Sequence, residues 1–205
     1  NQNMQIKVLN VETNQSFYLT NNRFDSYDPN FSTDGKWLYF VSDRTFNTSV
    51  GSPWGPRQPE PYYTKTSKIY MLALYDSLRS PFLNYDELNP KEEKKDEKKE
   101  TTQAKTDDKK KKEKEKSVKP EKQPDMTGAV SRFYEVPVPA DNISGLQVTK
   151  KYLYWIQSDP SDFQGRKLMS LEISNKKDNI PVEVTDKVQG YDVSGDGEKL
   201  LIRKA

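Results

Sequence analysis

Hydrophobic and polar residues alternate along much of this chain, which is the pattern of strands that are buried on one face. The run MQIKVLNVE (4–12) places Ile6 and Val8 on one apolar face, and the turn TNQS joins it to the run FYLT (17–20). This arrangement predicts a β-hairpin. The run WLYFV (37–41) is apolar at every position, which predicts a strand buried between neighbouring sheets. Strand character resumes in KIYMLALYD (68–76).

The same pattern returns in the second half of the chain. We predict strands over 133–138 and 145–156, the second of which turns near Thr149-Lys150. The runs KLMSLEIS (167–174) and IPVEVT (180–185) flank the polar turn NKKDN and predict another hairpin. A last strand is predicted over Lys199–Arg203.

One short sequence occurs twice, as FSTDG (31–35) and as VSGDG (193–197). Each copy is a predicted turn before a strand, and Gly35 supplies the positive φ that a tight turn needs. Both copies follow a hairpin and a connector, which is the order in which one β-propeller blade leads into the next. We therefore predict an all-β fold of partial β-propeller blades from two consecutive propellers, joined by a disordered charged linker. A blade cannot bury both faces alone, so each part needs neighbours.

The charged linker is set apart by its composition. Residues 91–122 hold 14 Lys and 10 acidic residues. Like charges four positions apart, such as Lys91/Lys95 and Glu93/Glu97, disfavour a helix in its first half. We assign 1–90 to the end of a first propeller, 91–125 to the linker and 126–205 to the start of a second propeller.

Charge and residue usage exclude several classes of function. The rest of the chain holds 19 of its 33 basic and 21 of its 31 acidic residues, so a general nucleic-acid or membrane-surface footprint is not supported. In the linker, acidic residues interleave with the Lys and no aromatic is present, which favours a spacer. The chain has no Cys and no His, which excludes disulfides, a Ser-His-acid triad and His-metal sites within it.

No apolar run approaches the ~18 residues that span a bilayer. We expect no catalytic residue, no cofactor and no metal in this chain. It opens on Asn1 inside a predicted strand, and we interpret it as a piece of a longer protein.

Some features allow a functional and a structural interpretation. Asp192-x-Ser194-x-Asp196-Gly197 begins like a calcium loop, but its twelfth position is Arg203, so turn capping is favoured. Six aromatic residues at strand spacing form either a ligand-stacking platform or, as we favour, core between blades: Trp37, Tyr39, Phe40, Tyr152, Tyr154 and Trp155.

Two further features remain. The Pro-rich stretch with Trp54, Tyr62 and Tyr63 either lines a peptide channel or contacts another subunit, or, as we favour, packs as a plain loop. The pairs Asp43-Arg44 and Asp162/Arg166 are interpreted as surface ion pairs rather than as an acid site.

The phrase FDSYDPNFSTDGKWLYFVSDRTFN (24–47) resembles the last blade of the first propeller in the tricorn protease family. SKIYMLAL and SPF resemble the next strand of that family, SRFYEVPVPADNISGL (131–146) resembles the entry into the second propeller, and VQGYDVSGDGEKLLIRK (188–204) resembles one of its blades. The resemblance covers 1–90 and 126–205. The Ser-x-Asp-Gly phrase by itself is shared with TolB-like and other propellers.

The resemblance implies a non-catalytic propeller scaffold that gates or guides peptides to a serine protease domain outside this chain. The parent protein would be a peptidase, its partners would be peptide substrates, and a homo-oligomer is left open. The resemblance favours the cytoplasm, with the periplasm as the alternative. One other candidate is a TolB-like propeller module for protein interaction, without hydrolase activity. Another is the propeller of a prolyl-oligopeptidase-like enzyme.

Overall fold

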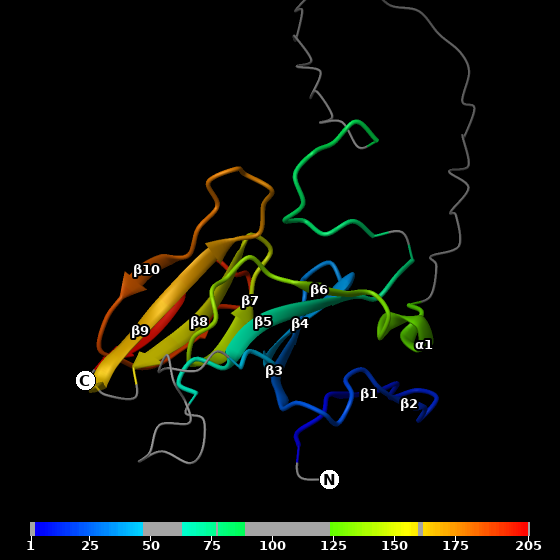
Figure 1. Ribbon diagram of the computed structural model, residues 1–205, viewed down its shortest axis with the longest axis horizontal. Helices are drawn as coiled ribbons and strands as arrows, with labels where there is room; N and C mark the ends of the chain where they lie inside the picture. The colour runs from blue at the N-terminus through cyan, green and yellow to red at the C-terminus, as the bar shows by residue number, and fades with distance from the viewer. Residues whose placement is uncertain (1–2, 47–62, 77, 89–123, 160–161, 205) are drawn as a thin grey trace, which may run out of the picture. The chain divides into compact units, whose positions relative to one another are not determined.

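The computed structural model describes residues 3–46, 63–76, 78–88, 124–159 and 162–204 (Figure 1). The chain divides into two compact units. Residues 1–84 and 124–205 form the first unit, and residues 85–123 form the second. All of the strands belong to the first unit.

The described residues form an all-β structure with a single short helix. The elements in chain order are β1 (Lys7–Leu9), β2 (Ser16–Tyr18), β3 (Ser26–Phe31), β4 (Trp37–Asp43), β5 (Ser67–Ala73), α1 (Met126–Ala129), β6 (Phe133–Glu135), β7 (Ile143–Val148), β8 (Tyr152–Asp159), β9 (Asp162–Glu172), β10 (Val182–Thr185), β11 (Val188–Val193) and β12 (Leu200–Lys204). The strands expected from the alternation of hydrophobic and polar residues are confirmed, although the strand expected over 133–138 ends at Glu135. The connectors expected before the two Ser-x-Asp-Gly turns are strands, β3 and β11, which pair with the strands that follow those turns.

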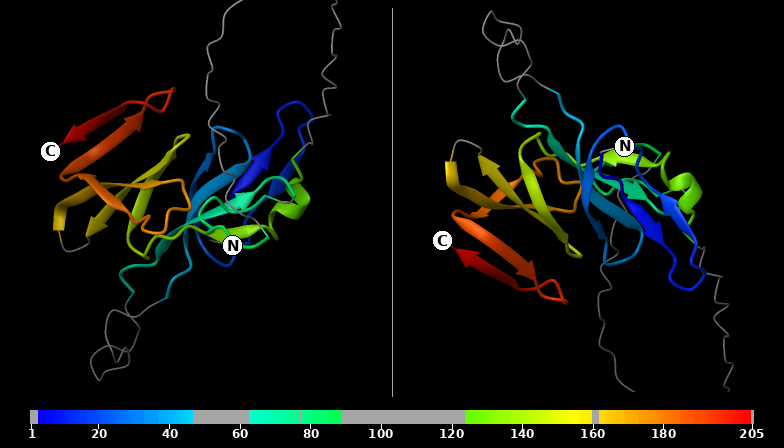
Figure 2. Two further views of the ribbon diagram at one scale, coloured as in Figure 1. Left: turned by 90° about the horizontal axis from the view of Figure 1, so that it is seen from above. Right: turned by 90° about the horizontal axis from the view of Figure 1, so that it is seen from below.

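The strands form four antiparallel sheets in chain order. Two are complete four-stranded sheets, β3-β4-β5-β6 and β7-β8-β9-β10. The other two are hairpins, β1-β2 before them and β11-β12 after them. Figure 2 shows the four sheets following one another from the blue hairpin to the red one. An all-β series of small sheets is thus confirmed.

The first complete sheet includes a strand from beyond the charged segment. Phe133 of β6 pairs with Leu72 of β5, and Lys68 forms an ion pair with Glu135 across the same strands. Arg132 holds the returning chain, because its guanidinium donates to the Ala73 carbonyl at 3.0 Å and to the Asp125 carboxylate at 3.0 Å. Residues 133–135 were expected to belong to the start of the second propeller (126–205). They instead complete the sheet of β3, β4 and β5, which lie within residues 1–90. The division into two propellers stays a prediction.

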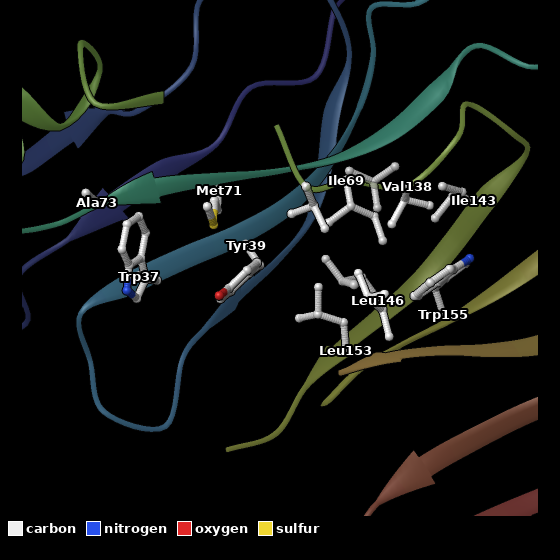
Figure 3. Close-up of a cluster of buried hydrophobic side chains, with 13 residues drawn as sticks. Trp37, Tyr39, Ile69, Met71, Ala73, Val138, Ile143, Leu146, Leu153 and Trp155 are labelled. Atoms are coloured by element: carbon white, nitrogen blue, oxygen red, sulfur yellow. The ribbon is translucent and has the colours of Figure 1, made fainter. Parts of the chain in front are cut away.

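The main core lies between the two complete sheets. Figure 3 shows side chains of β4 and β5 facing those of β7 and β8. Trp37, Tyr39 and Val41 point into this core, where Leu153 and Trp155 meet them. The intervening residues of β4 point the opposite way, so Leu38 and Phe40 pack with the β1-β2 side of the sheet. This double burial explains why WLYFV is apolar at every position.

The two Ser-x-Asp-Gly turns have the same hydrogen bonds. Ser32 Oγ donates to Asp34 at 2.5 Å and accepts from the Trp37 amide at 3.0 Å. Ser194 Oγ donates to Asp196 at 2.5 Å and accepts from the Lys199 amide at 2.9 Å. Gly35 has a φ of 65° and Gly197 a φ of 72°, the left-handed region in which glycine is favoured.

Candidate functional site

The first strands of successive sheets, β3, β7 and β11, are joined by polar contacts. Each strand has an irregular register: between Tyr27 and Asn30, between Ser144 and Gln147, and between Val188 and Gly190. Bulges of this kind turn polar groups out of the regular ladder. We call the contacting residues Tyr27, Asp28, Asn30, Gly145, Gln147 and Tyr191 the first-strand seam.

Asp28 connects β3 to β7. Its φ is 50°, a conformation that Asp adopts more readily than most non-glycine residues, and its carboxylate accepts from the Gly145 amide at 2.5 Å. The Asn30 side chain donates to the Leu146 carbonyl at 2.7 Å. Gly145 also has a positive φ, 62°, so the left-handed residues of two neighbouring bulges meet.

Tyr191 and Gln147 connect β7 to β11. The Tyr191 hydroxyl donates to the Gly145 carbonyl at 2.5 Å. Because the Gly145 amide donates to Asp28, Gly145 is hydrogen-bonded to both neighbouring first strands, β3 and β11. The Gln147 side chain donates to the Tyr191 carbonyl at 3.4 Å and accepts from the Val193 amide at 3.1 Å. Burial, with the charge of Asp28 as a smaller contribution, raises the pKa of Tyr191 above its ordinary value, so this phenol keeps its proton at neutral pH.

A second polar group lies where β3, β4 and β5 meet β7. The Tyr27 hydroxyl is 3.1 Å from Asp43 Oδ1, 3.0 Å from Ser67 Oγ and 3.3 Å from the Ile143 carbonyl oxygen. Ser67 donates to Asp43 at 2.7 Å. Burial raises the pKa of Tyr27 to about 12, and the negative charge of Asp43 acts in the same direction. The phenol is therefore a neutral hydrogen-bond donor.

Asp141 extends this group toward the next sheet. It is buried, and its carboxylate accepts from Gln157 Nε2 at 2.7 Å and from Lys65 Nζ at 3.2 Å. Its backbone exchanges two hydrogen bonds with that of Ser67, at 3.0 and 3.1 Å. The two complete sheets are thus held together by polar contacts as well as by the core.

The Ser67–Asp43 pair has little capacity for nucleophilic catalysis. Ser67 is only 5% exposed, and its hydroxyl proton is directed at Asp43. A nucleophilic serine needs access to substrate and a base that takes its proton and passes it on, which is usually a histidine. The chain has no histidine. We therefore interpret Tyr27, Asp43 and Ser67 as a structural group.

A hollow of about 470 Å³ lies at the other end of the sheets, next to the β3–β4 and β7–β8 turns. Its volume is within the range of small-molecule sites. The lining is mixed, with aromatic surface and two opposite charges: Ser32, Thr33, Asp34, Trp37, Tyr39, Pro81, Thr149, Lys150 and Ile173. It presents no obvious catalytic group.

The aromatic residues singled out from the sequence divide into three groups. Trp37, Tyr39, Phe40 and Trp155 are buried, which confirms the core interpretation for them. Tyr154 is half-buried. For Tyr152 the prediction was wrong: it is 38% exposed, because it begins β8 at the edge of the core.

The predicted ion pairs have other partners. Asp43 is bound by Tyr27 and Ser67, while the Arg44 guanidinium lies 4.4 Å from the Phe133 ring centroid and 5.4 Å from that of Tyr70. This is cation–π packing. Burial lowers the pKa of Arg44 from its ordinary value.

The remaining sequence-based candidates are placed only in part. Arg166 donates to the Gln189 carbonyl at 3.1 Å, and the Asp162 side chain lies outside the described part of the chain. Trp54 and Tyr62 also lie outside the described residues. Tyr63 is 36% exposed, and its ring centroid is 5.7 Å from that of Phe46.

Ser194 and Asp196 of the calcium-like sequence hold their turn together, as turn capping predicts. Among the described residues there is no group of three or more metal-binding side chains. Within the same residues, no helix is long and apolar enough to cross a membrane.

The seam residues were missed by the sequence interpretation. A Tyr-Asp pair precedes each Ser-x-Asp-Gly turn, but Tyr27 stands five residues before Ser32 and Tyr191 three residues before Ser194. The two pairs therefore occupy different places in the repeat, and no repeated pattern marks the seam.

No family model matches this sequence, and no curated protein matches it. Among solved structures, the chain is similar to the crystal structure of the tricorn protease, with a TM-score of 0.67 and 17% sequence identity. The match covers 98% of this chain and 17% of that protein. The chain thus spans about a sixth of the length of the structure it matches. Its β-rich fold resembles a part of the tricorn protease.

Proposed function

We propose that this chain is a non-catalytic β-propeller scaffold of a tricorn-like serine protease. In this proposal its first-strand seam contacts peptides on their way to a protease domain outside the chain. The observation that carries the proposal is the structural similarity to part of the tricorn protease, which extends over 98% of the chain. The resemblance of four stretches of the sequence, in order, to the same family also supports it.

The seam has properties suited to transient contact with a peptide. The first strands of a propeller surround its central channel, and here the seam residue Gly145 is exposed, as are Gln189 and Asp192 of β11 beside the seam. An extended peptide offers amide donors and carbonyl acceptors, which exposed polar groups bind without a deep apolar pocket. Most other polar groups of the seam are already hydrogen-bonded to one another, so the seam would bind a peptide weakly. Weak binding suits a peptide that must move on to the protease domain.

Two experiments test the two halves of the proposal. The first is hydrolysis of fluorogenic peptides by the chain, for which we expect no turnover; turnover abolished by a serine-directed reagent would overturn the scaffold role. The second is the gene sequence beyond residue 205. A PDZ-like segment and a Ser-containing protease domain would support the proposal. A downstream Gly-x-Ser-x-Gly elbow, or an end after a few more repeats, would favour the prolyl-oligopeptidase-like or TolB-like alternative.

Peptide contact is measured by fluorescence anisotropy of a labelled unstructured peptide. We expect Gln189→Trp, which adds bulk at an exposed bulge residue of β11, to weaken binding at least tenfold. Lys177→Trp, in the exposed β9–β10 turn, is the matched control and should bind as the wild type does. Equal binding by both variants would rule out the seam as the contact surface.

A further inference from the structure

The hollow beside the β3–β4 and β7–β8 turns is built from both complete sheets. Residues 32–34 line it from one turn and residues 149–150 from the other, and its volume is about 470 Å³. The first turn is held by the hydrogen bonds of its Ser-x-Asp-Gly sequence, and in the second Thr149 Oγ1 accepts from the Tyr152 amide at 2.9 Å. The walls are thus fixed by local hydrogen bonds, as in the largely pre-formed pockets that bind small molecules.

Two buried side chains of β4 direct unused hydrogen-bond donors into this hollow. Trp37 is 6% exposed and Tyr39 is 1% exposed, and both belong to the lining. Figure 3 shows the indole nitrogen of Trp37 and the hydroxyl oxygen of Tyr39 on the side of their rings that is turned away from Met71 and Ala73. No described residue accepts a hydrogen bond from either group. Among unpartnered side-chain nitrogen and oxygen atoms of the described residues, only Ser174 Oγ is sealed from solvent, so both donors reach the hollow.

The Tyr39 hydroxyl acts as a donor at neutral pH. Burial, with the charge of Asp34 as a smaller contribution, raises the pKa of Tyr39 above its ordinary value, so the phenol keeps its proton. A nearly buried donor without a protein partner costs free energy unless water or a ligand accepts its hydrogen bond. The hydroxyl therefore favours a ligand that brings an acceptor into the hollow.

The rim of the hollow carries one ammonium and one carboxylate. Lys150 is exposed, and it forms no ion pair with a described residue. Asp34 Oδ1 accepts from the Ser32 hydroxyl at 2.5 Å and from the Lys36 amide at 3.1 Å, whereas Oδ2 lies 3.9 Å from Lys36 Nζ. A carboxylate oxygen with only this loose contact can still accept a hydrogen bond from a ligand.

These groups discriminate between classes of ligand. Asp34 would repel a simple anion such as phosphate, and Lys150 would repel a simple cation. A wholly apolar molecule would leave the two buried donors unpaired. Pro81 and Ile173 add apolar surface to the lining, which a purely polar ligand would leave unused. A zwitterion with an apolar side chain satisfies every part of the lining.

We propose that the hollow binds the zwitterion of an apolar amino acid, either free or as a dipeptide. The carboxylate of the ligand accepts from the Tyr39 hydroxyl, the Trp37 indole and the Lys150 ammonium. The ammonium of the ligand donates to Asp34, and its side chain packs against the apolar part of the lining. Hydrogen bonds between charged or polar donors and a carboxylate are stronger than those between neutral groups. The proposal rests neither on the scaffold role nor on the first-strand seam, since no seam residue lines the hollow.

Isothermal titration calorimetry of the full chain tests the ligand class, with L-leucine and leucyl-leucine as the probes. We expect saturable binding with a dissociation constant of about 1 mM or below for at least one of them. The probe that binds more tightly identifies the source, a free amino acid or a dipeptide. L-Leucinamide lacks the carboxylate and 4-methylpentanoate lacks the ammonium, so each should bind at least tenfold more weakly than L-leucine. Failure of both probes to saturate, or equal binding of L-leucine and the two truncated molecules, would overturn the proposal.

Two variants test the residues of the hollow. Tyr39→Phe keeps the ring and should weaken binding about tenfold, because a hydrogen bond to a charged group is lost. The urea midpoint of this variant should stay unchanged, since the hydroxyl has no partner among the described residues. Tyr27→Phe removes a phenol hydroxyl from the same core outside the hollow and should bind the ligand as the wild type does. Unchanged binding by Tyr39→Phe, whatever its midpoint, would overturn the proposal.

The charge of Lys150 is tested against that of its neighbour. Lys150→Gln should weaken binding at least about threefold, as expected for an exposed ion pair. Lys151→Gln removes a charge at the next exposed position, outside the lining, and is the matched control. Equal binding by the two variants would exclude Lys150 from the site. Gln189→Trp, expected to impair peptide contact at the seam, should bind L-leucine as the wild type does, so the two proposals fail separately.

Discussion

The Tyr27 hydroxyl is the most informative single group to remove, because it lies where the two complete sheets meet. Tyr27→Phe keeps the ring in the core and deletes only the oxygen. That oxygen is 3.1 Å from Asp43, 3.0 Å from Ser67 and 3.3 Å from the Ile143 carbonyl. Because Ser67 already donates its hydroxyl proton to Asp43, the Tyr27 hydroxyl donates to the Asp43 carboxylate and to the Ile143 carbonyl.

The expected cost follows from these partners. A hydrogen bond to a charged group contributes about 1.5–3 kcal/mol, and a long bond to a carbonyl adds little. Asp43 keeps its bond from Ser67 in the variant, so the loss falls in the lower part of that range. We expect Tyr27→Phe to reduce the free energy of unfolding by about 2 kcal/mol. With a urea m-value of about 2 kcal/mol/M, the midpoint falls by about 1 M.

Urea unfolding followed by tryptophan fluorescence measures this change, since Trp37 and Trp155 are buried in the core between the sheets. Wild type and variant are compared at one protein concentration, because association would shift both midpoints. Tyr152→Phe, at a 38% exposed position, should leave the midpoint within about 0.2 M. A Tyr27→Phe midpoint within the same margin would show that the Tyr27 hydroxyl does not hold the two sheets together.

Three further outcomes are expected. Leu153→Ala empties a position that is 0% exposed and should cost about 2–5 kcal/mol in urea unfolding, whereas Val130→Ala at a 48% exposed position should cost less than about 0.5. Gly35→Ala and Gly197→Ala should each lower stability by about 1–2 kcal/mol, because φ is 65° and 72° there. The loss of stability should be larger at Gly197, because a Cβ added there would lie 3.2 Å from the Thr149 Cβ. Equal thermal midpoints for the two variants would contradict this difference. Finally, the pKa of Tyr27 is raised to about 12 from 10.0, so its proton stabilises the fold fully below pH 10 and this contribution is lost as the pH rises to 12. The stability difference between wild type and Tyr27→Phe should therefore shrink over that interval, and a constant difference would argue against it.

Elements governed by local chemistry could be predicted from the sequence. The strand over 37–41 and the two Ser-x-Asp-Gly turns depend on residue types within a few positions of one another. The apolar run in β4 also indicated burial on both faces, and the cores on its two sides confirm it. The resemblance to the tricorn family rested on the same local phrases.

Contacts between distant residues were not predictable in this way. Arg44 was expected to pair with its neighbour Asp43, but the fold brings Phe133 from beyond the charged segment to within 4.4 Å of its guanidinium. Tyr27 and Asp28 carry no special local signal, and their partners in β7 lie more than a hundred residues away. A single sequence records which residues prefer a strand but does not record which strands meet.

Most strands, the turns and the all-β class followed from the sequence alone, because hydrophobic alternation and glycine conformation act over a few residues. That β6 completes the sheet of β3, β4 and β5 across the charged segment became known only from the folded chain. The same holds for the polar side chains that join successive first strands. Strand partners are chosen by burial and hydrogen bonding over the whole fold, which residue order along the chain does not specify.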